Sequence, residues 1–480
     1  MKGWRIHKAL ITLVLTLTLA ASLSGCKYNS FDEYLEALGM KDAEDSAVES
    51  SSGASVIVSE DSTTSEQGAS VVSSIDSSNA ASSENSDDAA AQDTSKEKRA
   101  DSDFESYYQS SDSLASDEEM QKQRAAIGLT DTGIASIKEK QKGLYCYERL
   151  TESGKTLYVE ILTIMQNLGK DILVSTTSDE AVELVFDYVC ADHPEIFYVD
   201  GYQYTNYTVD GVITKISFSG NYIYDKDEIA RRETLINEYV NKCLEGAPNS
   251  EDDYYAIKYV YEYIIENTEY DVNAADNQNI CSVFMTGKSV CNGYAKATQY
   301  LLNKLGIPCT LCVGTVNTKT SKGVRHAWNL VLCNNVYYYV DTTWGDSSYQ
   351  TSSGESADAT KLPKVNYDYL NVTSAEITQN HTFSDVLDVP VCTNTTDNYY
   401  VREDEYFTSA ELSLVGDLFK RRYADGSDNV TIKCASKEVY DSIFEELITN
   451  RKVFDYLQGD NSVVSYTTFA DTKTIIIWLK

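Results

Sequence analysis

The chain has 480 residues and a formal net charge of −34. A charge of that sign argues against a nucleic-acid-binding protein, because holding a phosphate backbone needs clustered Lys and Arg. With 42% hydrophobic residues and 36 tyrosines, the chain has enough apolar surface for two or three packed domains.

Residues 1–25 predict an export signal. A basic head is followed by an apolar run over 9–23, which is shorter than a membrane span and ends in small residues. The run closes on "LSGC", which resembles the bacterial lipobox, and this resemblance implies cleavage before Cys26 and a lipid on that cysteine. An ordinary cleaved signal with a chance cysteine is the alternative. We expect a bacterial lipoprotein outside the cytoplasmic membrane, held at the cell surface by acyl chains.

Residues 26–110 predict a disordered tether. The tract over 43–103 is rich in Ser, Asp and Ala, and no aromatic residue occurs between Tyr34 and Phe104. Such a segment cannot bury enough apolar surface to offset the entropy lost on ordering. About 60 flexible residues span roughly 45 Å on average, enough to hold a domain away from the membrane.

Residues 111–247 predict an N-terminal α/β region. Apolar residues recur at helical spacing in 154–168 and 178–199, whereas 202–224 alternates in the manner of strands around an Asp-Gly turn. A histidine before a proline at a helix exit is more often structural than catalytic, so His193 is assigned no catalytic role.

Residues 248–388 contain the pattern that carries chemistry. After helical stretches, a helix is predicted from Cys291 to about Gly306, because apolar residues return every three or four positions and glycine favours a helix end. The segment 326–344 then predicts a β-hairpin with Asn334 and Asn335 at its turn, since asparagine tolerates the left-handed backbone of tight hairpins.

The predicted hairpin brings a histidine and an aspartate together. If Cys333 pairs with Val336, Asp341 becomes the diagonal neighbour of His326 on the same face, and diagonal neighbours lie about 7–8 Å apart. A loop one residue longer or shorter would turn Asp341 to the opposite face. An aspartate in this place fixes the histidine tautomer and stabilises the imidazolium.

Cys291 suits the role of nucleophile, because amide dipoles at the start of a helix stabilise a thiolate. Thiolate, imidazolium and carboxylate together make a triad for acyl transfer. Each residue alone is weak evidence, since a lone cysteine or a strand histidine is usually a core residue. Their order and contexts carry the hypothesis.

Three segments of this region carry a family resemblance. The stretches "VCNGYAKATQYLLNKLGIPC", "HAWNLV" and "YVDTTWGD" resemble the motifs of the transglutaminase-like superfamily in its bacterial, protease-like branch, which is also similar to a domain of cytokinesis proteins. The resemblance spans about 250–381 and implies Cys291 as nucleophile, His326 as base and acid, and Asp341 as orienting group. It also implies an α+β, papain-like fold in which the cysteine helix packs on an antiparallel sheet.

The resemblance has one departure and leaves part of the site open. Many members have glycine where this chain has Ser289, which affects the loop leading into the helix. One oxyanion donor is the Cys291 backbone N–H, and the second is open, with Tyr270 or a tryptophan among the choices. Trp328 and Trp344 either wall a substrate cleft or belong to the core.

Residues 389–480 predict a small C-terminal α/β domain without a catalytic grouping. The 11 cysteines suggest no disulfide framework, and "CTLC" at 309–312 has no second pair at metal-ligand spacing, so neither a metal nor a cofactor is predicted.

Two functions of the central domain compete on this sequence, and a third hypothesis makes the C-terminal unit the active part, a partner-binding domain with the central domain as scaffold. The first is a membrane-anchored cysteine enzyme that forms a thioester on a peptide or protein amide, then acts as a peptidase or amidase with water, or as a cross-linking transglutaminase with an amine. Location alone suggests cell-wall peptide or surface protein as substrate. The second is a non-catalytic module that binds cell wall or protein in the same cleft.

Overall fold

The computed structural model describes residues 13–19, 117–209, 212–317, 322–346, 362–459 and 463–479. The predicted lipid site Cys26 and the tether over 26–110 lie outside these residues. Part of the predicted signal, β1 (Leu13–Leu19), runs antiparallel to β3, from Leu13 opposite Thr208 to Leu19 opposite Tyr202. No helix among the described residues is both long and apolar enough to span a bilayer.

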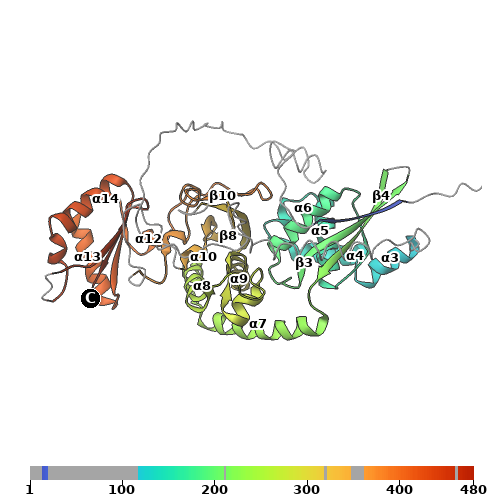
Figure 1. The fold of residues 1–480 in the computed structure, drawn as a ribbon, viewed down its shortest axis with the longest axis horizontal. Coiled ribbons are helices and arrows are strands. Elements are labelled where there is room, and N and C mark those ends of the chain that lie inside the picture. The colour runs from blue at the N-terminus through green and yellow to red at the C-terminus, as the bar shows by residue number, and fades with distance from the viewer. Residues whose placement is uncertain are drawn as a thin grey trace, which may run out of the picture.

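The N-terminal region packs helices on a sheet of order β1-β3-β4-β2 (Figure 1). Its helices are capped by side-chain oxygens, for example Thr151 before α5 and Ser178 before α6, as their sequences favour. The elements are α3 (Asp117–Ala126), α4 (Asp131–Gln141), α5 (Glu152–Gln166), β2 (Ile172–Val174), α6 (Asp179–Asp192), β3 (Val199–Val209) and β4 (Val212–Tyr222). The predicted hairpin over 202–224 is thus confirmed as β3 and β4.

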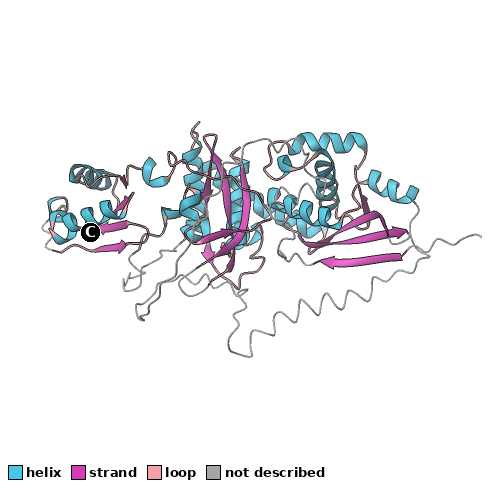
Figure 2. Ribbon diagram, turned by 90° about the horizontal axis from the view of Figure 1, so that it is seen from above, coloured by secondary structure: helices cyan, strands magenta, loops and turns pink. Residues whose placement is uncertain are grey.

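The central part holds the predicted cysteine helix against an antiparallel sheet of order β10-β7-β8-β9. Figure 2 shows these strands as a group in the middle of the molecule, with helices beside them. Its elements are α7 (Lys226–Gly246), α8 (Asp253–Asn267), β5 (Glu269–Tyr270), β6 (Lys288–Ser289), α9 (Cys291–Lys304), β7 (Cys309–Val316), β8 (Val324–Cys333), β9 (Val336–Val340), α10 (Thr342–Gly345), α11 (Ser374–Ile377) and β10 (His381–Phe383).

Helix α9 begins and ends where its sequence indicates. Tyr294, Ala297 and Leu301 are fully buried, which is the apolar stripe expected at helical spacing. Gly306 follows the helix with φ of +83°, a conformation that glycine adopts without a steric penalty. The α+β fold with a cysteine helix on an antiparallel sheet is confirmed.

The C-terminal unit lies at one end of the molecule and the N-terminal region at the other (Figure 1). The sheet of the C-terminal unit has the order β11-β12-β14-β13. The elements of this unit are β11 (Tyr406–Phe407), α13 (Leu412–Ala424), β12 (Asn429–Cys434), α14 (Lys437–Phe444), β13 (Tyr466–Phe469) and β14 (Thr474–Trp478), and the short α12 (Tyr399–Arg402) precedes them.

Two large hydrophobic cores divide the described residues. One extends from Leu129 to Tyr400 and joins the N-terminal region to the central part; the other extends from Phe407 to Leu479. Tyr399 and Tyr400, which follow the predicted boundary at 388, therefore pack with the central core. The chain passes to its second core only beyond Tyr400.

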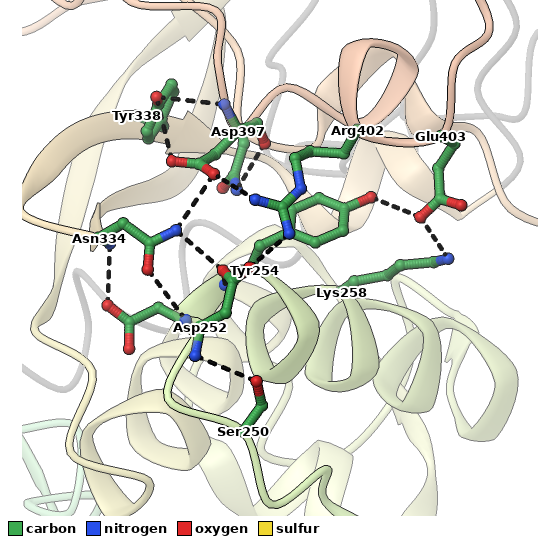
Figure 3. Close-up of polar contacts among 11 residues, drawn as sticks. Ser250, Asp252, Tyr254, Lys258, Asn334, Tyr338, Asp397, Arg402 and Glu403 are labelled. Atoms are coloured by element: carbon green, nitrogen blue, oxygen red, sulfur yellow. Dashed lines mark hydrogen bonds and ion pairs between the residues drawn. The ribbon is translucent and has the colours of Figure 1, made fainter.

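A polar cluster holds the turn of the central hairpin (Figure 3). Asn334 and Asn335 have φ of 49° and 64°, so this is the left-handed turn that the asparagines predict. The Asn334 amide donates to Asp252 at 2.9 Å and to Asp397 at 3.1 Å. Arg402 forms ion pairs with both carboxylates. The start of α8 and the segment around α12 thus fix the turn from two sides.

Candidate active site

The register of the hairpin is the predicted one. Cys333 lies opposite Val336, and the ladder continues to Asn329 opposite Val340. Asp341 follows β9 directly, and in this register it comes opposite Trp328. His326 is two residues before Trp328 in the same strand, so Asp341 and His326 lie on the same face. His326 Nε2 donates to Asp341 Oδ2 at 2.7 Å, and neither side chain is exposed.

The buried pair is electrostatically an ion pair. Burial opposes a positive charge on His326, but the charge and hydrogen bond of Asp341, together with Cys291, raise the pKa of His326 to about 10. Burial likewise opposes a negative charge on Asp341, yet His326 and then His381 hold the pKa of Asp341 well below its ordinary range. Imidazolium and carboxylate are therefore the forms present near neutral pH.

Cys291 is the first residue of α9 and is 7% exposed. Because Asp341 occupies Nε2 of His326, Nδ1 is the ring nitrogen left for the thiol. Nδ1 is buried without a hydrogen bond of full geometry, although Cys291 interacts closely enough to raise the pKa of His326. Thiol and ring thus lie near each other without a hydrogen bond of full geometry.

Ser289 closes the loop that leads into α9. Its hydroxyl lies 2.6 Å from that of Ser282, and both side chains are fully buried. A Cβ atom on Gly293 would lie 1.9 Å from the Ser289 hydroxyl. The hydroxyl therefore fills space beside the first turn of the helix, and the departure from glycine is matched by a glycine four residues later.

A second histidine, which the sequence analysis did not assign, joins the site. His381 Nε2 lies 2.9 Å from the same Asp341 Oδ2, and its Nδ1 lies 2.5 Å from Asn380 Oδ1. Burial lowers the pKa of His381. The chain has only four histidines, so rarity was the one signal in the sequence that pointed to this residue.

His326, Asp341 and His381 are also the one group among the described residues with the composition and proximity of metal ligands. A tetrahedral zinc ion would separate its nitrogen and oxygen ligands by about 3.3 Å. The observed separations of 2.7 and 2.9 Å are those of hydrogen bonds instead. In this arrangement the shared oxygen accepts two N–H groups.

The tryptophans beside His326 belong to the core. Trp328 and Trp344 are 0% exposed, with ring centroids 6.0 and 5.9 Å from that of His326. They pack behind the histidine and do not line an open cleft. Tyr270 is half-buried on β5, with its ring 6.4 Å from that of Tyr294 on α9, and its role as an oxyanion donor stays a prediction.

The family model of the transglutaminase-like superfamily matches residues 240–342, a span that contains Cys291, His326 and Asp341. The chain carries a transglutaminase-like domain.

Relatives of this chain are distant. Kyphoscoliosis peptidase of Mus musculus is 22% identical over 222 residues, which cover 43% of this chain and 32% of the relative, and the Homo sapiens protein of that name matches equally. The chain thus spans about a third of the length of these relatives.

Among solved structures, one described as a TGase is 16% identical, covering 33% of this chain and 48% of its own, with a TM-score of 0.23. A candidate cysteine protease from Cytophaga hutchinsonii is also 16% identical, covering 29% and 56%, with a TM-score of 0.20.

Proposed function

We propose that this protein is a cysteine acyl-transfer enzyme in which Cys291 is the nucleophile, His326 the base and acid, and Asp341 the orienting group. One observation carries the proposal: the buried Asp341 holds Nε2 of His326, which leaves Nδ1 toward a thiol at the start of a helix. A thiol, an imidazole and a carboxylate in this order are the parts that thioester chemistry needs.

The reaction begins after the thiol proton of Cys291 has passed to Nδ1 of His326, which is the step that makes the ring an imidazolium. The thiolate attacks the carbonyl carbon of a peptide or side-chain amide, and the Cys291 backbone N–H is placed to donate to the developing oxyanion. His326 then protonates the departing nitrogen, so the C–N bond breaks and a thioester remains on Cys291. Asp341 keeps Nε2 protonated and the imidazolium stabilised throughout.

The second half of the reaction decides between two activities. If water attacks the thioester with His326 as base, the enzyme is a peptidase or amidase. If a primary amine attacks, it is a transglutaminase. We favour hydrolysis, because water is abundant.

The proposal extends to location. The "LSGC" segment supports lipid attachment at Cys26, and the tether that follows would hold the enzyme outside the cytoplasmic membrane, within reach of cell-wall peptide or surface protein. Incorporation of labelled palmitate into the full chain, and its loss in Cys26→Ala, tests this part independently of catalysis.

The chemistry is tested by trapping the thioester. The full chain is incubated with glutamine-containing peptides, with and without a fluorescent primary amine, and intact mass spectrometry follows the protein and the products. An acyl adduct that disappears in Cys291→Ala, but not in the matched variant Cys281→Ala, supports the enzyme. Peptide retention without any adduct or product, unchanged in Cys291→Ala, would favour a binding module instead.

A further inference from the structure

Asp341 is held by donors from three separate elements. His326 on β8 and His381 on β10 both contact Oδ2, while the backbone N–H of Trp344 in α10 donates to Oδ1 at 3.0 Å. Three donors fix both the position and the plane of a carboxylate. His326 lies within the span 240–342 that the family model matches, whereas Trp344 lies two residues beyond its end and His381 lies 39 residues beyond it.

The His381 contact is built into the fold. β10 is a strand of three residues, and His381 lies opposite Val316 of β7 at the edge of the central sheet. The His381 side chain is fully buried, with ring centroids 4.9 Å from those of Trp328 and Trp344. The ring therefore has one position available, with Nε2 toward Asp341.

The charges around His381 define its proton arrangement. Asp341 and His326 face it from the hairpin, and the ring of Tyr369, a buried phenol whose pKa is raised by burial, lies 6.1 Å from the His381 ring by centroid distance. An N–H on Nε2 is required in either charge state, because a carboxylate oxygen can only accept. Burial and the His326 cation disfavour a positive charge on His381, whereas Asn380 Oδ1, 2.5 Å from Nδ1, can only accept and so favours an N–H there as well.

We propose that His381 is a positioning residue of the triad: its Nε2–H holds Asp341 Oδ2 in line with His326 and weakens the acceptor that Asp341 presents to His326. The inference rests on the proposed function for its catalytic meaning. The hydrogen-bond relation itself can be measured without catalysis. A carboxylate oxygen shared between two donors is a weaker acceptor for each, so His381 tunes the proton affinity of His326.

Two replacements separate the hydrogen bond from the packing. His381→Gln can place a side-chain N–H near the position of Nε2, whereas His381→Met fills similar volume without a donor. Both are made in full-length Cys291→Ala, which removes the thiol contribution to His326 and brings its titration to lower pH. With only four histidines in the chain, imidazole NMR signals can be assigned by single substitutions.

In His381→Met the titration midpoint of His326 is expected to rise by about one pH unit, the size expected when a hydrogen bond to a charged group is removed. His381→Gln is expected to stay close to the parent. An unchanged midpoint in His381→Met, or equal shifts in both variants, would overturn the proposal.

A second measurement needs no change at position 381. The unsubstituted chain should show two slowly exchanging imidazole N–H protons, from His326 and His381, and both should be displaced in Asp341→Asn. Finding only the His326 proton would refute the shared contact. If both protons appear but no thioester forms, the proposed function fails while the His381 contact stands.

Discussion

Replacing Asp341 with asparagine tests the electrostatic core of the site. A rise in the pKa of His326 from 6.5 to about 10 multiplies the ratio of imidazolium to neutral ring by about 3000. In Asp341→Asn there is no carboxylate charge to offset the effect of burial on His326, so we expect the pKa of His326 to fall below 6.5. The asparagine side chain still accepts from the Trp344 N–H, but its NH₂ group faces Nε2 and favours the other tautomer.

The size of this electrostatic effect can be measured as the rate at which Cys291 is alkylated. Without an imidazolium beside it, a cysteine of ordinary acidity is only about 3% thiolate at pH 7. Because thiolates of lower basicity are also weaker nucleophiles, we expect alkylation at pH 7 to slow by between about tenfold and thirtyfold. At pH 9, where an ordinary thiol is largely ionised, the two rates should agree within about threefold.

The assay is iodoacetamide labelling of the full chain, resolved for each cysteine by mass spectrometry. Nine other described cysteines serve as internal references, since burial raises the pKa of each. Asp346→Asn is the matched control: it makes the same chemical change at a neighbouring aspartate, which accepts a hydrogen bond from the hydroxyl of Tyr294 and not from His326. Equal rates at pH 7 for Cys291 in the parent and Asp341→Asn would refute the reasoning.

Three further predictions concern stability. Gly293→Ala should lower the free energy of unfolding, measured by urea titration, by about 1–3 kcal/mol, because the new methyl group meets the Ser289 hydroxyl. Adding Ser289→Gly should recover most of this loss. Equal stability of the single and double variants would contradict the contact. Arg402→Ala should cost about 3 kcal/mol, because it leaves the nearly buried Asp397 without its cation; a loss under about 0.5 kcal/mol would show the pair to be inert. Because the pKa of His326 is raised on folding, its contribution is complete below about pH 6.5 and is lost as pH rises through about 10. The urea midpoint should therefore fall over that range by more in the parent than in a chain with His326→Gln.

Local patterns in the sequence predicted the contact between His326 and Asp341 and the start of a helix at Cys291, because both depend on short-range rules. Two asparagines determine a two-residue turn, the period of a strand then decides which face Asp341 takes, and helical spacing identifies the start of α9 at Cys291. His381 could not be found in this way. It belongs to a three-residue strand that pairs with β7 across 65 positions of sequence, and such a short strand has no measurable periodicity.

Burial was the other property that the sequence could not decide. Trp328 and Trp344 flank the triad in the chain whether they line a cleft or fill the core, since an indole suits both environments. Whether these two indoles are buried depends on packing against β10 and Tyr369, which come later in the sequence. Likewise, the core that joins the N-terminal region to the central part is made of contacts distant in sequence.

The tryptophans packed behind His326 also give the protein an optical signal of its own. Of four tryptophans in the chain, Trp328 and Trp344 lie within 6.0 Å of this ring by centroid distance. A protonated imidazole quenches a neighbouring excited indole more strongly than a neutral one, so the emission of these two side chains should follow the charge on His326. In the proposed reaction, each proton that His326 takes up or releases would then be visible in stopped-flow fluorescence, without a label.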